Sequence, residues 1–220
     1  MGGPGVLETV ARIIELGGGS GQAGRVANLK ADFEARTGSF APEDAWFEAR
    51  SRAFWIDAVT RGRFGREVEA SLEAAERRWL EPLERAHRGL FRAEGARLVD
   101  VWSGAVLVPG IVDDASRAEL DAATGQLFDA RLVGADDPPV IALLPGAVFH
   151  PRQATIAIEP VLAAARALDW GVDETLDRLL LMERSLRALS RVKAAYAYRA
   201  EALSAPRRAE SPWRPEKRLS

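Results

Sequence analysis

The sequence predicts an α+β protein that is mainly helical. A small antiparallel β block, at about residues 90–149, is expected between an N-terminal helical region and a C-terminal helical pair. Two observations predict this class. Apolar residues recur at helical spacing on both sides of the block, whereas inside it short apolar runs alternate with turn residues. With 220 residues, 47% of them hydrophobic, the chain can bury a sizeable core.

The N-terminal region begins with two predicted helices. Residues 6–16 place Val10, Ile13 and Ile14 at helical spacing, and Gly17 is a candidate C-cap. A glycine-rich stretch follows, and residues 25–37 form the second predicted helix.

From these patterns we predict three units along the chain. Residues 1–40 are a helical, flexibly attached segment that contains the linker 17–24, and residues 41–203 are a compact α+β domain. Residues 204–220 contain three prolines and few apolar residues, which predicts a disordered basic tail.

The compact domain opens with further predicted helices. Proline and two acids at residues 41–44 are typical of a helix start. Trp46 and Trp55 follow at helical spacing, and we interpret them as core residues rather than as a binding platform. Residues 66–88 keep a helical register in which Pro82 predicts a kink or a new start near Leu80.

After Gly89 the pattern changes to short strands separated by turns. Ser103-Gly104 predicts a hairpin, and Pro145-Gly146 predicts another turn. Residues 111–126 read as an acidic loop that has room for one helical turn. About five strands in sixty residues predict a strongly bent sheet or an open barrel. The predicted strands cover residues 97–102, 105–108, 127–133, 140–144 and 147–149.

Two helices are predicted after the β block. The first covers residues 152–169 despite Pro160. The second begins with Asp173 as its N-cap and runs to about Leu203, which would make it about 45 Å long. Such a helix could pack across the domain or pair with a partner helix, and we favour packing.

The glycine-rich stretch carries the one motif that suggests a cofactor. Gly19, Gly21 and Gly24 satisfy G-x-G-x-x-G, and residues 13–21, IIELGGGSG, resemble the first motif of S-adenosylmethionine-dependent methyltransferases. The resemblance implies that these glycines approach the cofactor from the end of a strand. It covers about a dozen residues, and residues 30–60 lack the next strand that such a fold requires.

No set of catalytic or metal-binding residues is recognisable elsewhere. The chain has no cysteine, and its two histidines, His87 and His150, are expected to have structural roles. The acidic pairs at 113–114 and 136–137 are interpreted as solvated loop residues. We therefore predict no catalytic residue, no metal and no cofactor, and we favour a protein that is not an enzyme.

Charge is distributed unevenly although the formal net charge is only −2. Residues 105–145 contain seven acids and two arginines, whereas residues 187–220 contain nine basic and three acidic residues. The basic end could contact nucleic acid or an acidic protein surface. The candidate contacts are Arg207, Arg208, Trp213, Arg214, Lys217 and Arg218.

Three functional classes follow from these observations. The preferred one is a non-enzymatic interaction or regulatory module that binds another protein. The alternative is nucleic-acid binding through the basic C-terminal region, and the third is S-adenosylmethionine or nucleotide binding at the glycines. Neither a signal peptide nor a membrane-spanning run is recognisable, so we expect a cytoplasmic protein, with its oligomeric state left open.

Overall fold

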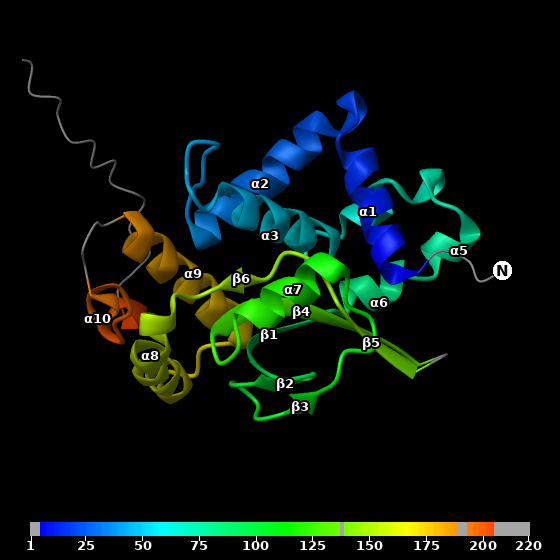
Figure 1. The fold of residues 1–220 in the computed structure, drawn as a ribbon. Coiled ribbons are helices and arrows are strands. Elements are labelled where there is room, and N and C mark those ends of the chain that lie inside the picture. Colours follow the sequence, from blue (N-terminus) through cyan, green and yellow to red (C-terminus); the bar gives the residue numbers. More distant parts are fainter. Residues whose placement is uncertain (1–4, 137–138, 189–192, 205–220) are drawn as a thin grey trace, which may run out of the picture.

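The computed structural model, which describes residues 5–136, 139–188 and 193–204, confirms the α+β class (Figure 1). A small antiparallel sheet lies between helical regions. The first region comprises α1 (Val6–Gly17), η1 (Ser20–Gln22), α2 (Ala23–Thr37), α3 (Phe47–Val59), α4 (Phe64–Glu67), η2 (Glu69–Ser71), α5 (Ala74–Arg77) and α6 (Leu80–Glu84).

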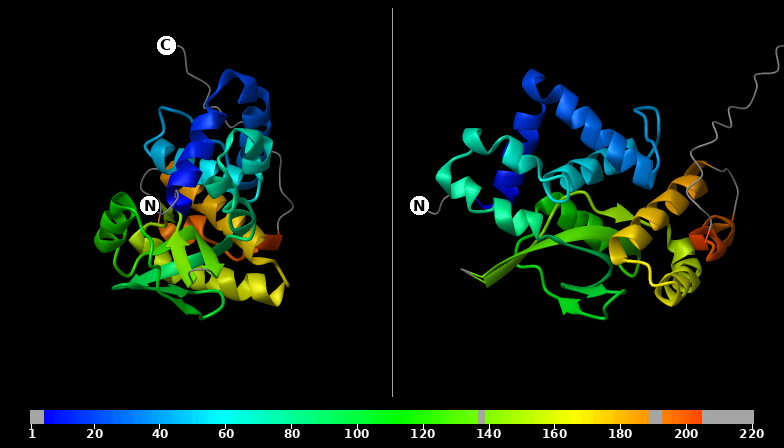
Figure 2. Two further views of the ribbon diagram at one scale, coloured as in Figure 1. Left: turned by 90° about the vertical axis from the view of Figure 1, so that its right-hand side faces the viewer. Right: turned by 180° about the vertical axis from the view of Figure 1, so that it is seen from behind.

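The β block and the C-terminal helices complete the described chain. The block comprises β1 (His87–Glu94), β2 (Arg97–Asp100), β3 (Val106–Leu107), α7 (Asp114–Ala122), β4 (Leu127–Asp136), β5 (Pro139–Leu143) and β6 (Val148–Phe149). The final region comprises η3 (Arg152–Ala154), α8 (Thr155–Ala167), α9 (Val172–Ala188), α10 (Ala194–Ala197) and α11 (Glu201–Ser204). Two further views show the N-terminal helices on one side of the sheet (Figure 2).

The strands follow a Greek-key order. The sheet runs β3-β2-β1-β4-β5, and β6 continues the β5 side by pairing with β4. Three consecutive strands are therefore followed by a fourth that returns beside the first, after a connection that contains α7.

The sheet also closes on itself, as the predicted open barrel requires. The segment that follows β3 reaches the opposite edge, where the amide nitrogens of Gly110 and Ile111 donate to the carbonyl of Ile141 at 2.9 and 3.2 Å. The Leu143 amide donates back to Ile111. Strands β1 to β5 therefore form a partly open Greek-key barrel, to which β6 is added through its pairing with β4. Its interior contains Phe91, Leu98, Phe128, Leu132 and Leu143 among other apolar residues.

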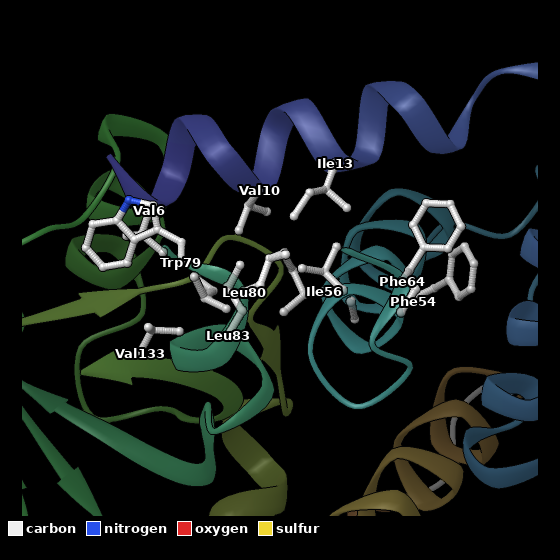
Figure 3. Close-up of a cluster of buried hydrophobic side chains, with 14 of the residues drawn as sticks. Val6, Val10, Ile13, Phe54, Ile56, Phe64, Trp79, Leu80, Leu83 and Val133 are labelled. Carbon is white, nitrogen blue, oxygen red and sulfur yellow. The ribbon is translucent and has the colours of Figure 1, made fainter. Parts of the chain in front are cut away.

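Helix α1 packs its apolar face against the helices that follow it (Figure 3). Val6, Val10 and Ile13 are at most 1% exposed and share one buried cluster with Ile56 of α3 and Leu80 of α6. Residues 6–16 are therefore helical, as predicted, and not a strand. The division of the chain at residue 40 stays a prediction. In the structure, residues on both sides of this position belong to one buried cluster.

Two helical predictions for the N-terminal half are corrected. The helix expected from residues 41–44 begins at Phe47, because the Asp44 side chain accepts from the Ala41 amide and forms a turn. The helix expected over residues 66–88 is instead a series of short helices, because Leu72 is extended and Glu73 begins α5 with a capping box. One predicted alternative is confirmed, since a new helix begins at Leu80, but β1 already begins at His87.

The loop expected at residues 111–126 contains a two-turn helix, α7. Asp113 is its N-cap, because the Asp113 carboxylate accepts from the amide and hydroxyl of Ser116 at 2.9 and 2.6 Å. Burial opposes ionisation of Asp113, but these hydrogen bonds lower its pKa. The acidic composition that favoured a loop was therefore partly a capping signal.

The single long C-terminal helix is also wrong. Helix α9 ends at Ala188, and Lys193 has an extended backbone and caps the separate helix α10. The chain folds back because Ala194, Tyr198 and Leu203 are buried in the same apolar cluster as α8. Of the predicted tail, residues 205–220 lie outside the described residues.

The turn between β5 and β6 depends on the packing around it. Gly146, between β5 and β6, has φ of 97°, and a Cβ there would lie 2.9 Å from the Arg52 backbone of α3. The turn thus needs glycine both for its conformation and for the close approach of α3 to the barrel.

In the part of the chain that is described, the helices are all too short or too polar to span a bilayer.

Candidate functional site

The glycine-rich stretch is a compact connection between two helices. Gly17 ends α1, Gly19 precedes η1, and Gly24 already belongs to α2. A Cβ on Gly17 would lie 2.9 Å from Phe64 and Trp55, so this glycine allows close helix packing. A Cβ on Gly21 or Gly24 would meet nothing within 4 Å. These two positions therefore do not require glycine for packing.

This arrangement lacks the context on which the methyltransferase resemblance depends. A helix, not a strand, precedes the glycines, and the strand pairs of the described sheet are antiparallel. The Trp46 and Trp55 side chains are partly buried against the core, which confirms their interpretation as core residues. The six candidate contacts of the basic tail lie outside the described residues.

The two histidines occupy different environments. His87, which the helix predicted over residues 66–88 would contain, is instead the first residue of β1, and its half-exposed ring lies 3.2 Å from the Asp100 carboxylate. His150 is fully buried, and its Nδ1 lies 2.8 Å from the Tyr198 hydroxyl. Burial lowers the pKa of His150 to about 4, so the ring is neutral at physiological pH.

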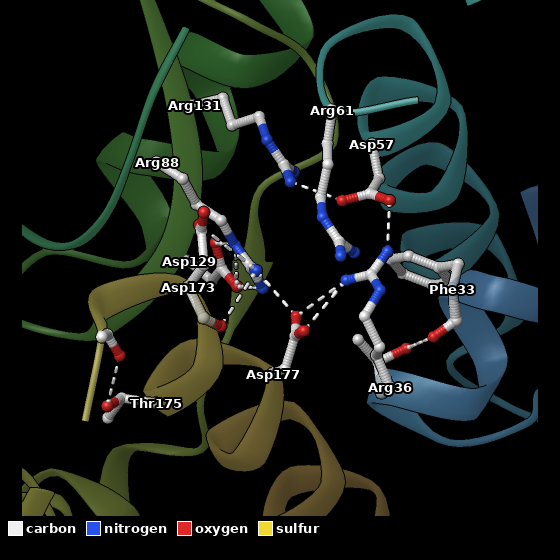
Figure 4. A network of polar contacts seen from close by, with 12 residues as sticks. Phe33, Arg36, Asp57, Arg61, Arg88, Asp129, Arg131, Asp173, Thr175 and Asp177 are labelled. Carbon is white, nitrogen blue, oxygen red and sulfur yellow. Dashed lines mark hydrogen bonds and ion pairs between the residues drawn. The ribbon is translucent and has the colours of Figure 1, made fainter. Parts of the chain in front are cut away.

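The most unusual feature of the molecule is a group of six buried charges, which we call the arginine cluster (Figure 4). Its members come from α2, α3, β1, β4 and α9, and each is between 4% and 8% exposed. It fills the space between the N-terminal helices and the barrel. The members are Arg36, Asp57, Arg88, Asp129, Arg131 and Asp177.

The charges alternate along one chain of contacts. Asp129 accepts from Arg88 Nη2 at 2.6 Å, and Arg88 Nη1 donates to Asp177 at 2.7 Å. Asp177 also accepts from Arg36 Nη1 at 3.0 Å. Asp57 then joins the last two arginines, because both Arg36 Nη2 and Arg131 Nη2 donate to it at 2.5 Å.

The charges in the middle of this series, Arg88 and Asp177, are balanced better by their neighbours than the charge at its end, Arg131. Burial opposes the charge of Arg88, but Asp129 and Asp177 outweigh that effect and raise its pKa. Burial would likewise raise the pKa of Asp177, yet the charges of Arg88 and Arg36 lower it. Arg131 differs, because burial and the neighbouring charge of Arg88 lower its pKa in spite of Asp57.

A pocket of about 430 Å³ opens beside the cluster, a volume suited to a small ligand. Arg88 and Arg131 form part of its wall, and Arg61 reaches in from the end of α3 (Figure 4). Glu84, His87 and Asp173 also line the pocket. Among the described residues no three or more acids and histidines are grouped to hold a metal.

A second hollow has the opposite character. An open groove of about 630 Å³ lies between α8 and α10. Its floor is apolar, and Ile156 is 83% exposed there. Gln153 and Lys193 are the polar residues of its border. The remaining lining residues are Ala157, Pro160, Ala194 and Ala195.

The sequence analysis predicted neither the pocket nor the groove, although the sequence contains one indication of the pocket. Asp129 and Arg131 interrupt the apolar pattern of the predicted strand 127–133, and buried charges in a strand require partners. Their partners on α2, α3 and α9 could not be paired without the fold. The groove had no comparable signal, because it depends on the break between α9 and α10.

Comparisons of this chain with family models, with curated proteins and with solved structures give no match. The function is therefore inferred from the pocket beside the arginine cluster and from the apolar groove.

Proposed function

We propose that this protein is a non-enzymatic interaction module that binds another protein, and that the groove between α8 and α10 is the contact surface. The observation that carries the proposal is the exposure of Ile156, at 83%, within a mainly apolar groove. Exposed apolar surface that is hollowed and bordered by polar residues is typical of protein contact sites. We place this interaction in the cytoplasm, because a chain without cysteine needs no oxidising compartment.

The groove fits an amphipathic helix of the partner. Helix α8 and the four-residue helix α10 form its walls, and small residues such as Ala157 and Ala195 leave room for larger side chains from outside. A helix docks in such a groove by laying one apolar face along it. Lys193 at the border favours a partner helix with an acidic residue beside its apolar face.

The proposal is tested by site-specific crosslinking followed by reconstitution. A photo-crosslinking residue at position 156 should capture a partner in native extract, whereas one at Val106, 56% exposed on the barrel, should not capture it. The captured protein is then purified, and its Kd is measured with the full chain. We expect Ile156→Asp to weaken this Kd at least about tenfold, because a charge replaces a desolvated apolar contact.

Val106→Asp is the matched control and should leave the Kd unchanged. Equal effects of the two substitutions, or a reconstituted complex insensitive to Ile156→Asp, would reject the groove as the contact surface.

Nucleic-acid binding through the basic C-terminal region is the second candidate. It is favoured by the nine basic residues against three acids at 187–220; five of the nine, together with Trp213, are the candidate contacts beyond residue 204. It predicts an affinity that falls steeply with salt concentration and is lost when residues 204–220 are deleted. A deletion variant with unchanged affinity for RNA and DNA would contradict it.

A further inference from the structure

Two arginines face each other across the barrel strands beside the pocket. Arg88 of β1 and Arg131 of β4 are directly paired in the sheet register, and both are buried. Like charges at paired positions repel each other, so such a pair needs compensation. Arg88 has it, since its guanidinium donates to both Asp129 and Asp177.

Arg131 is compensated much less. Among the described residues it donates a single hydrogen bond, from Nη2 to Asp57. No hydrogen bond from its Nε or Nη1 to another described residue is present. The Arg131 guanidinium, which is 8% exposed, therefore has unused donors in the wall of the pocket.

A third guanidinium stands at the mouth of the same pocket. The Arg61 side chain is 46% exposed, and the one ion pair that it makes within the described chain, with the exposed Asp32, is long at 3.4 Å. Figure 4 shows its guanidinium directed toward the cluster, between Arg131 and Arg36. Such a side chain can turn to a ligand at little cost, because an exposed ion pair contributes little.

The acids of the pocket do not neutralise these groups. Glu84 is engaged by Arg66 at 2.5 Å, and Asp173 is 66% exposed and lies 3.7 Å from Arg88 rather than from Arg131. The six members of the arginine cluster balance one another, three charges of each sign. Arg61 therefore adds a positive charge beside a buried guanidinium that still has free donors.

We propose that this pocket binds an oxyanion of a small molecule, a phosphate or a carboxylate, through Arg131 and Arg61. The planar guanidinium fork matches the paired oxygens of either group, and burial strengthens hydrogen bonds from a charged donor. The bound anion would also place a second negative charge beside Arg131, which is the last of the alternating charges. This inference concerns a different surface from the groove and does not depend on it.

The test is calorimetric titration of the full chain with inorganic phosphate and, separately, with succinate at constant ionic strength. We expect saturable binding of at least one ion, with a stoichiometry of one, and a shift of the Arg131 Nε–H resonance in NMR spectra. Preference for phosphate would indicate a phosphate ester as the ligand, and preference for succinate a carboxylic acid. Arg131→Gln and Arg61→Gln should each weaken binding roughly tenfold or more, as expected when a hydrogen bond to a charged group is lost.

Arg85→Gln is the matched control, because Arg85 lines the same pocket but is 77% exposed and paired with Glu81 at 2.6 Å. It should change the affinity less than twofold. If Arg131→Gln does not fold, the half-exposed Arg61 carries the test. The proposal is overturned if neither ion saturates below about 10 mM, a range that covers millimolar dissociation constants, or if Arg85→Gln weakens binding as much as Arg61→Gln.

Discussion

Two buried regions of this molecule are held together by different forces. Where the N-terminal helices meet the barrel, the interior contains the arginine cluster. Where α8 and α10 pack on α9 and α11 packs on α8, the interior is an apolar cluster in which His150 and Tyr198 form a buried polar pair. The first region depends on every charge having its partner, whereas the second depends on how completely its volume is filled.

The difference explains why a ligand site is expected beside one region and a protein contact beside the other. Arg131 is the last of the alternating charges, and its guanidinium has unused donors in the wall of a pocket. A packed apolar cluster has an edge, and at Ile156 that edge remains uncovered among the described residues. The pocket thus borders the arginine cluster where Arg131 has unused donors, and the groove borders the apolar cluster where Ile156 is exposed.

The largest expected effect tests whether the arginine cluster behaves as one unit. Asp177→Asn leaves Arg36 and Arg88 buried without their shared carboxylate. We expect the free energy of unfolding, measured by urea denaturation, to fall by about 3–5 kcal/mol. Asp173→Asn is the control at an exposed position of the same helix, and its effect should stay within about 0.5 kcal/mol. A similar small loss for both variants would show that the buried charges are not coupled.

The apolar region is tested with two isoleucines of the same helix. Ile158 is fully buried and Ile156 is 83% exposed. Ile158→Ala should cost about 2–5 kcal/mol of unfolding free energy because it leaves a cavity. Ile156→Ala should stay within about 0.5 kcal/mol, which separates the groove's binding role from stability. A large loss at Ile156 would mean that the groove is covered in the native protein.

The buried histidine makes the apolar region sensitive to pH. The folded-state pKa of His150, about 4, lies below its unfolded value of about 6.5, so its contribution is fully present above pH 6.5 and is lost as the pH falls toward 4. We expect stability to fall by about 2 kcal/mol between pH 7 and pH 5 from this residue. His150→Asn should remove that slope, whereas His87→Gln, at a half-exposed ring, should retain it. An unchanged slope in His150→Asn would assign the pH dependence to other groups.

The smallest effects distinguish a packed glycine from an open one. Gly17→Ala should destabilise by about 1–3 kcal/mol, because the new methyl group would meet Phe64 and Trp55 at 2.9 Å. Gly21→Ala, with no neighbour within 4 Å, should be neutral or stabilise by up to about 1 kcal/mol. Thermal denaturation of both variants decides this, and S-adenosylmethionine binding that is lost in Gly21→Ala would restore the cofactor hypothesis.

The sequence predicted features that depend on local pattern. The helix at residues 6–16, the hairpin around Ser103-Gly104 and the strand at 127–133 all formed, because the periodicity of their side chains decides between helix and strand. It failed at residues 66–88, where a helical spacing continued across positions that the fold bends. Local spacing cannot report an extended residue such as Leu72, whose conformation is set by tertiary packing.

By itself the sequence determined the α+β class, the location of the β block and the apolar faces of the main helices, since each of these is written in neighbouring residues. Only the tertiary structure decided that Arg36, Asp57, Arg88, Arg131 and Asp177 meet, and that α10 returns to α8 to form a groove. A buried charge is stable only beside a partner, and here the partners are as many as 141 residues apart in the chain. Contacts at such separations depend on the fold of the whole chain, which no local pattern records.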